Sequence, residues 1–274
     1  MLFFVEGESD EIALELPLSN LIYEKYPDYQ VRFLRQERRV NKAGNELEDV
    51  EIDEDDEFEG DEFIEEDEYE YCGDITTSSF VTPSNIENKI THRFIRPAIQ
   101  KEGIYPKRIA KIIHIVDLDG AYIPNECIVP YSGECQGKEK IYYDGENGII
   151  TAANVSAIIE RNERKRRNLE HLLTLPEQKI KVKTKSIPYE IYFFSSNLDH
   201  FINNDANIQS GKKFLAGRFV RTYGFDTEDF SKYFFEDEDS VGHMGYKESW
   251  NFIKENSNSV KRYTNIDCLI RRLM

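Results

Sequence analysis

Two short apolar runs, far apart in the chain, end abruptly in carboxylates. Residues 2–6 read Leu-Phe-Phe-Val-Glu, and residues 110–116 read Ala-Lys-Ile-Ile-His-Ile-Val before Asp117 and Asp119. Short apolar runs of this kind are typical of strands buried in a parallel sheet. Because such sheets bind ligands beyond the carboxyl ends of their strands, we expect Glu6, Asp117 and Asp119 to converge at one edge.

The remaining pattern alternates helices with strands. Apolar residues at helical spacing predict helices over about 10–25, 83–103 and 154–173, with Pro17 kinking or delaying the first and Pro97 interrupting the second. Further strands are expected at 30–34 and 189–194, with a hairpin turn at 142–145. From about residue 208 the chain is predicted to be helical, with a core of aromatic residues: Phe214, Phe219, Phe225, Phe230, Tyr233, Phe234, Trp250 and Phe252.

This order of elements predicts an α/β fold with a mostly parallel sheet flanked by helices. We expect a catalytic domain at residues 1–205, an acidic insertion at 36–74 within it, and a helical C-terminal cap at 206–274. The length of 274 residues and the hydrophobic content of 39% are sufficient for a folded core of this size.

The net charge of −17 is a local feature of the chain. Residues 46–70 hold 17 of its 52 acids and no Lys or Arg, so the other 35 acids balance the 35 basic residues. The acidity therefore does not exclude a nucleic-acid substrate. The segment is interpreted as a solvated loop, or as an acidic strip that mimics polynucleotide charge, covers the site or binds a basic partner.

Targeting signals and membrane spans are not evident in the sequence. No apolar stretch approaches the roughly 20 residues needed to cross a bilayer, and the N-terminus lacks the basic region of a signal peptide. The four cysteines show no regular spacing and are expected to be reduced thiols. These features predict a cytoplasmic protein without a membrane partner.

Carboxylates two residues apart at a strand end favour divalent-metal chemistry. Side chains at this spacing point to the same side of a strand, and hard oxygen ligands suit Mg²⁺ or Mn²⁺. Gly120 would let the chain leave the sheet without crowding a ligand. The pattern therefore indicates metal-assisted phosphate chemistry at Asp117 and Asp119.

Two stretches resemble a known family. Phe4-Val5-Glu6-Gly7-Glu8-Ser9-Asp10, followed downstream by Val116-Asp117-Leu118-Asp119, is similar to the TOPRIM domain of topoisomerases, bacterial primases and OLD-type nucleases. The resemblance covers about residues 2–35, 80–125 and 185–205. It implies that Glu6 is a general acid/base or metal ligand, that Asp117 and Asp119 hold Mg²⁺, and that Asp10 (or its rival Glu11) and Asp199 are further acidic ligands.

The resemblance also implies a biological setting. A free-standing TOPRIM protein of this size, with a helical cap, is similar to the nuclease effectors of bacterial phage-defence systems such as PARIS. Two departures are the long gap between Glu6 and Asp117 and the lack of a Gly-x-x-x-x-Gly-Lys-Ser/Thr motif. Any ATPase or regulatory partner would then be a separate chain. The resemblance is also compatible with a homodimer.

Basic residues provide candidates for contact with a polynucleotide. Lys212, with Lys213 beside it, is the candidate for a cation that stabilises charge in the transition state. A basic cluster within the helix predicted at 154–173 is interpreted either as a solvated face or as a groove that follows phosphates. It comprises Arg161, Arg164, Lys165, Arg166 and Arg167.

Two alternatives to a Mg²⁺-dependent endonuclease stay open. An apolar strand ending in Asp-x-Asp-Gly also begins the motif of HAD-type phosphatases, in which Asp117 would be a covalent nucleophile. That reading does not account for Glu6, and Ala121 stands where such enzymes usually have Thr. The other alternative is a non-catalytic regulatory or binding subunit that acts through the acidic strip.

Overall fold

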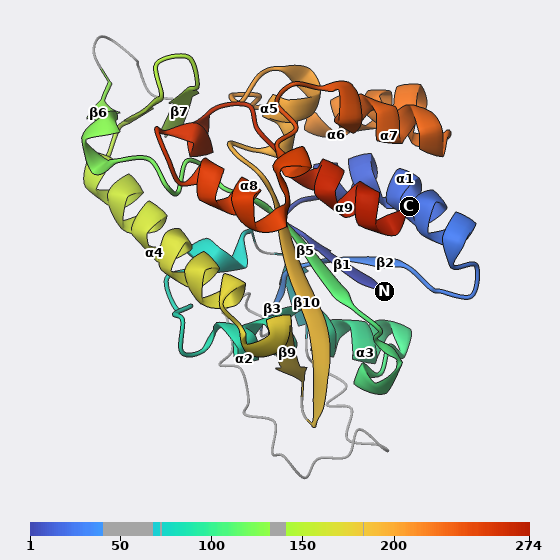
Figure 1. Ribbon diagram of the computed structural model, residues 1–274. Coiled ribbons are helices and arrows are strands. Elements are labelled where there is room, and N and C mark those ends of the chain that lie inside the picture. The colour runs from blue at the N-terminus through green and yellow to red at the C-terminus, as the bar shows by residue number, and fades with distance from the viewer. Residues whose placement is uncertain (41–67, 72, 132–140, 183) are drawn as a thin grey trace.

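The computed structural model describes residues 1–40, 68–71, 73–131, 141–182 and 184–274 (Figure 1). Most of the acidic insertion expected at 36–74 lies outside these ranges. Strands β3 and β4, which flank the omitted residues 41–67, pair in antiparallel fashion with Glu37 opposite Tyr71. Within the described residues, no helix combines the length and apolarity that crossing a bilayer requires.

The core is a five-stranded sheet in the order β2-β1-β5-β10-β9. The first four strands are parallel, and β9 pairs with β10 in antiparallel fashion. A small second sheet has the order β6-β8-β7. The strands are β1 Leu2–Val5, β2 Arg32–Arg35, β3 Glu37–Val40, β4 Glu68–Tyr71, β5 Ile112–Asp117, β6 Ile128–Pro130, β7 Ile141–Asp144, β8 Ile149–Ala152, β9 Lys179–Val182 and β10 Lys185–Phe194.

Helices cover both faces of the large sheet (Figure 1). Helix α1 continues through Pro17, and Pro97 lies in the first turn of α3, after a π-helical turn at Thr91–Ile95. The helices are α1 Glu8–Lys25, α2 Ile86–Ile90, α3 Arg96–Glu102, α4 Val155–Leu173, α5 Leu198–Asn203, α6 Lys212–Phe219, α7 Thr227–Glu236, α8 Tyr246–Ile253 and α9 Ile266–Leu273. The α/β fold class expected from the sequence is confirmed.

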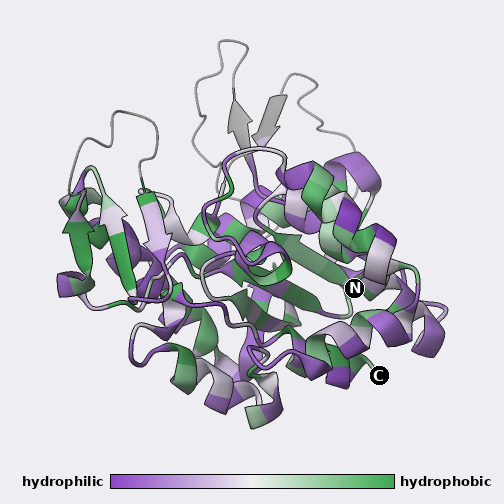
Figure 2. Cartoon of the chain, turned by 90° about the horizontal axis from the view of Figure 1, so that it is seen from above, coloured by the Kyte–Doolittle hydropathy of each residue, from purple (hydrophilic) through white to green (hydrophobic). Residues whose placement is uncertain are grey.

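The alternation of side chains along the strands divides the interior into two cores. Phe4 of β1 packs with α2, α3, α4 and α8 on one face, whereas Phe3 packs with α1, α6, α7 and α9 on the other. The C-terminal helices therefore contribute to both cores. Figure 2 shows the apolar strands of the large sheet enclosed by helices whose outer faces are hydrophilic.

Two of the aromatic residues expected in the C-terminal core are instead exposed. Phe214 keeps 67% and Phe225 71% of its surface accessible, while Phe219, Phe230 and Phe234 are buried as predicted. Residue composition does not reveal this difference, because the direction in which each ring points depends on how α6 and the π-helical turn at Val220–Gly224 pack on α1.

His114 of β5 is buried at the centre of the sheet, and its Nδ1 shares a hydrogen bond of 2.6 Å with the Tyr189 hydroxyl. Burial lowers the pKa of His114 to about 4. The unfolded chain, with an ordinary histidine pKa near 6.5, binds this proton more tightly. The contribution of His114 to stability is therefore complete at neutral pH and is lost as the pH falls towards 4.

We expect the free energy of unfolding to lose about 2 kcal/mol from His114 alone between pH 7.5 and pH 5. His114→Phe removes the titrating group while it keeps a ring in the core. Urea unfolding of both proteins at the two pH values should show a smaller decline for the variant. Declines of the same size in the two proteins would contradict the assignment.

Candidate metal centre

The carboxyl ends of β1, β5 and β10 meet at one edge of the sheet, because these strands run in the same direction. Glu6 follows β1 and Asp117 ends β5. The Glu6 carboxylate crosses to the neighbouring strand, where its Oε1 accepts a 3.0 Å hydrogen bond from the backbone N–H of Asp117. The predicted convergence of the two carboxylate-terminated strands is thus observed.

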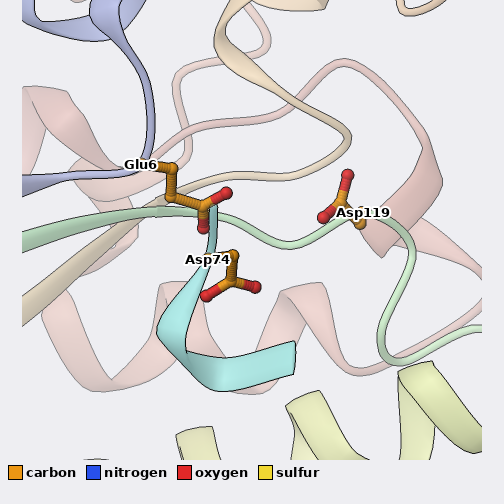
Figure 3. A group of neighbouring side chains, drawn as sticks. All are labelled: Glu6, Asp74 and Asp119. Atoms are coloured by element: carbon orange, nitrogen blue, oxygen red, sulfur yellow. The ribbon is translucent and has the colours of Figure 1, made fainter. Parts of the chain in front are cut away.

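Three carboxylates from separate segments form a compact acidic triad at this edge. Glu6, Asp74 and Asp119 each offer an oxygen within 4.8 Å of the others (Figure 3). Their side chains keep only 14%, 7% and 21% of their surface accessible. Clusters of hard oxygen ligands with this proximity suit a divalent cation.

Asp74 is the member of the triad that sequence reasoning missed. The sequence predicts it at the end of the acidic insertion, yet it caps a short 3₁₀ turn at Ile75–Thr77 and accepts a 2.7 Å hydrogen bond from the backbone N–H of Thr76. The only local signal is an Asp two residues before a Thr, which indicates a cap. No strand-end pattern pointed to this residue, because Asp74 does not end a strand of the large sheet.

Asp119 reaches the triad through an unusual backbone turn. Strand β5 ends at Asp117, and Asp119 and Gly120 both have left-handed conformations, with φ of 51° and 71°. The alternation expected of a strand therefore stops before Asp119. As a result, the two aspartates bind different partners: Asp117 accepts from the N–H of Leu198, and Asp119 from the hydroxyl of Tyr143.

Helix α4 holds this turn in place. Arg161 donates a 2.8 Å hydrogen bond to the carbonyl of Asp119, and the Asn162 amide donates to the carbonyl of Gly120 at 3.1 Å. A side chain at position 120 would collide with Ile150, because an added Cβ would lie 2.6 Å from its Cδ1. Glycine is therefore favoured at this position by its positive φ, and any larger residue would also have to displace the end of the Ile150 side chain.

A fully buried ammonium lies among the three carboxylates. Nζ of Lys165, from α4, is 2.8 Å from Asp74 Oδ2, 2.9 Å from Asp119 Oδ2 and 3.6 Å from Glu6 Oε1. Burial alone would lower the pKa of Lys165, but the surrounding carboxylates outweigh it and raise the pKa well above its usual value. The lysine is therefore charged and neutralises part of the triad.

Glu6 and Asp119 respond differently to this environment. Burial, reinforced by the charge of Asp74, raises the pKa of Glu6 well above its usual value. Burial would also raise the pKa of Asp119, but Lys165 and Arg161 lower it below its usual value. The Lys165 ammonium thus stabilises the ionised form of Asp119, which it contacts at 2.9 Å, more than that of Glu6, which lies 3.6 Å away.

A second acidic group adjoins the triad. Burial, reinforced by the charge of Asp199, raises the pKa of Asp10 to about 6. Asp117 lies close enough to Asp10 for its own pKa to be raised well above the usual value by burial and then by that charge. Lys212 pairs with Asp199 at 2.8 Å, whereas the other oxygen of Asp199 is buried without a hydrogen-bond partner.

Asp10 also has a structural role. Its Oδ2 accepts a 2.8 Å hydrogen bond from the N–H of Gly7, which precedes α1. A carboxylate in the first turn of a helix stabilises the exposed N–H groups there. Glu11, the rival candidate, instead pairs with Arg35 at 2.8 Å.

The basic cluster of α4 does not form one continuous surface. Lys165 is buried in the triad, Arg161 binds the Asp119 turn, and Arg164 donates to the carbonyl of Thr77. Arg167 is exposed and Arg166 is partly exposed. Helical periodicity rotates neighbouring residues by about 100°, so five consecutive or near-consecutive basic residues point in several directions.

Comparison with known proteins identifies no family, since no family model, curated protein or solved structure matches the chain. What is established is an α/β protein with a mostly parallel sheet and an acidic triad that could hold a metal ion.

We expect Lys165→Met to reduce the free energy of unfolding by about 3–5 kcal/mol, because it leaves three carboxylates buried without a counter-charge. Urea unfolding in EDTA measures the loss. Lys213→Met is the matched control, since Lys213 pairs with Glu8 at the surface and keeps 64% of its side chain exposed. An unchanged unfolding midpoint for Lys165→Met would show that the lysine does not stabilise the triad.

Proposed function

We propose that this protein is a Mg²⁺-dependent nuclease of the TOPRIM class that cleaves phosphodiester bonds of DNA or RNA. The observation that carries the proposal is the triad of Glu6, Asp74 and Asp119, with oxygens within 4.8 Å of one another at the carboxyl edge of a parallel sheet. A site at this edge is where open α/β sheets bind their ligands.

The residues of the triad fit a divalent cation. All three donors are carboxylate oxygens, the ligand type that Mg²⁺ and Mn²⁺ favour. Lys165 supplies one positive charge against three carboxylates, and the raised pKa of Glu6 reflects its burial first and then the negative charge of Asp74, which this ammonium does not fully balance. A further cation at this position would offset the remaining repulsion.

Separate roles follow for the chain's own residues. Glu6, Asp74 and Asp119 would hold the ion, which supplies Lewis-acid activation of the phosphate and of an attacking water when bound. Asp117, whose raised pKa favours the protonated form, can exchange a proton near the reacting groups. Lys212, beside Asp199, supplies positive charge for the phosphate.

Asp10 and Asp199 are proposed as additional acidic ligands. Support comes from the buried, unpartnered oxygen of Asp199, which is an acceptor without a donor in the described structure. A buried acceptor of this kind is costly unless a donor or a cation satisfies it. Arg166 and Arg167 remain as the members of the basic cluster that could meet phosphates, since their guanidinium groups are at least partly exposed.

The biological setting rests on the sequence resemblance. The order of Glu6 and the later Asp-x-Asp pair supports an effector of bacterial anti-phage defence that acts in the cytoplasm. Such an effector would be controlled by a separate ATPase or regulatory protein, and it could act as a homodimer. The acidic segment 46–70 is the candidate region for binding a basic partner.

One observation favours a second candidate, a non-catalytic binding subunit. Lys165 already provides a permanent counter-charge 2.8–2.9 Å from two carboxylates of the triad. A lysine in this position could stabilise the fold in place of a metal. The two candidates differ in one measurable property, because only the nuclease requires Mg²⁺ binding.

The phosphatase alternative gains less support. Its nucleophile would be an ionised Asp117, but burial and the charges of Asp10 and Asp119 raise the pKa of this carboxyl well above its usual value. A protonated carboxyl is a poor nucleophile.

We expect Asp74→Asn and Asp119→Asn each to reduce Mg²⁺-dependent cleavage of polynucleotide by at least about 100-fold, because each removes a charged ligand with little change in shape. Gel assays on single- and double-stranded DNA and RNA measure cleavage, and calorimetry measures Mg²⁺ binding. Asp28→Asn, an exposed position in the loop before β2, is the matched control.

Activity that persists in EDTA, or that survives in both triad variants, would overturn the nuclease assignment. Wild-type protein that neither binds Mg²⁺ nor cuts polynucleotide, while it remains folded, would support the binding subunit instead. Hydrolysis of small phosphate monoesters that is lost in Asp117→Asn would favour the phosphatase.

A further inference from the structure

Helix α6, the π-helical turn Val220–Gly224 that continues it and the residue after that turn carry exposed aromatic and basic side chains. Phe214 and Phe225 are the two most exposed phenylalanines of the C-terminal region, at 67% and 71%. Arg218 and Arg221 lie between them in sequence and are also exposed. We call Phe214, Arg218, Arg221 and Phe225 the exposed stripe.

Phe214 and Arg218 are four residues apart in α6 and share one face of it. Arg221, in the π-helical turn, lies on the same side, because its guanidinium is 5.9 Å from the Phe214 ring, and the exposed Phe225 directly follows that turn. The opposite face carries Ala216 and Phe219, which are buried in the core shared with α1. Figure 1 shows α6 lying near α1 at the outer layer of the molecule. The exposed stripe therefore faces away from the core.

No internal partner accounts for the stripe among the described residues. Neither Arg218 nor Arg221 forms an ion pair with a described carboxylate, and the nearest aromatic contact is the Phe214 ring, 5.9 Å from the Arg221 guanidinium. An exposed phenylalanine ring does not contribute the free energy that burying it would give. Exposed aromatic rings next to unpaired cations are features of binding surfaces.

The stripe begins beside the candidate metal centre. Lys212, the first residue of α6, pairs with Asp199 at 2.8 Å, and Lys213 pairs with Glu8 at 2.6 Å. Both pairs fix the first turn of α6 against the carboxyl edge of the sheet. At about 1.5 Å per residue, the stripe then extends for about 20 Å from this edge.

We propose that the exposed stripe binds an unpaired, single-stranded segment of DNA or RNA and guides it to the acidic triad. Phe214 and Phe225 stack on exposed bases, and Arg218 and Arg221 contact the phosphates between them. Aromatic platforms combined with a basic path are the means by which proteins bind single strands with little sequence preference. This inference rests on the proposed nuclease function and specifies its substrate as an unpaired strand.

The arrangement favours single-stranded over double-stranded nucleic acid. A base in a regular duplex is stacked on its neighbours and offers no free face to a protruding phenylalanine ring. Guanidinium groups between the rings match the charge of a phosphate backbone. A docked apolar protein segment would instead require contiguous apolar side chains, which the two arginines interrupt.

The test measures binding without cleavage. Fluorescence anisotropy in EDTA follows a labelled, mixed-sequence 20-nucleotide single strand, as DNA and as RNA, and the duplex of the same sequence. We expect Phe214→Ala and Phe225→Ala each to weaken single-strand binding by roughly 5- to 100-fold and to leave duplex binding unchanged. Arg218→Gln with Arg221→Gln should lower the slope of log K against log salt by about 1.4.

The control carries matched changes at the opposite edge of the sheet. Tyr26→Ala combined with Lys107→Gln and Arg108→Gln removes one exposed ring and two exposed cations from segments that precede β2 and β5. Binding by this variant should equal that of the wild type. Thermal unfolding of every variant confirms that the fold is kept, since all the changed side chains lie at the surface.

The outcomes separate this inference from the nuclease proposal. Wild-type affinity in both phenylalanine variants, or an equal loss of affinity for single strand and duplex, would overturn the proposal that the stripe binds single strands, even if Mg²⁺-dependent cleavage is present. Loss of single-strand affinity that is confined to the stripe variants supports it, even if cleavage is absent and the nuclease proposal fails.

Discussion

The contact between one buried lysine and three carboxylates is the constraint on which this structure depends. Lys165 is fully buried, and lysines are buried in this way almost only when they are paired. Its partners come from segments centred on residues 6, 74 and 119. Charges of one sign cannot be gathered at a sheet edge without compensation, because burial removes the screening by water. The ammonium allows the segments to meet.

The same contact joins distant parts of the chain. Helix α4 supplies Lys165 to the triad, and it also supplies Arg161 and Asn162 to the backbone of the Asp119–Gly120 turn. A turn with two consecutive left-handed residues is costly in isolation, so its geometry is maintained by these bonds. The position of the Asp119 carboxylate is therefore a property of α4 as much as of β5.

The uneven distribution of positive charge gives the site its chemical character. Lys165 and Arg161 favour ionised Asp119, whereas Glu6, Asp10 and Asp117 have raised pKa values because burial and mutual repulsion outweigh the available cations. Clustered, perturbed carboxyls are characteristic of functional sites, because a fold gains no stability from buried repulsion. Helix α6, which carries the exposed stripe, begins beside this site, where Lys212 pairs with Asp199 and Lys213 with Glu8.

Sequence periodicity alone determined the α/β class, the four parallel strands of the large sheet and the long helices α1 and α4, because burial of apolar faces follows directly from spacing along the chain. It missed the small sheet, and the hairpin turn predicted at 142–145 was wrong, since 141–144 form β7 and the turn follows at 145–148. It also located Glu6 and Asp117, since residues that end parallel buried strands must share an edge. The tertiary structure decided the rest. Asp74 belongs to the site although it caps a 3₁₀ turn outside the large sheet. Asp119 has a left-handed backbone conformation, so its side chain does not follow the alternation of strand β5. Lys165 is buried although its neighbours in sequence are basic and polar. Phe214 and Phe225 are exposed although they match the buried aromatics in type. In each case the direction of a side chain is set by packing between elements far apart in sequence, and local patterns carry no information about that packing.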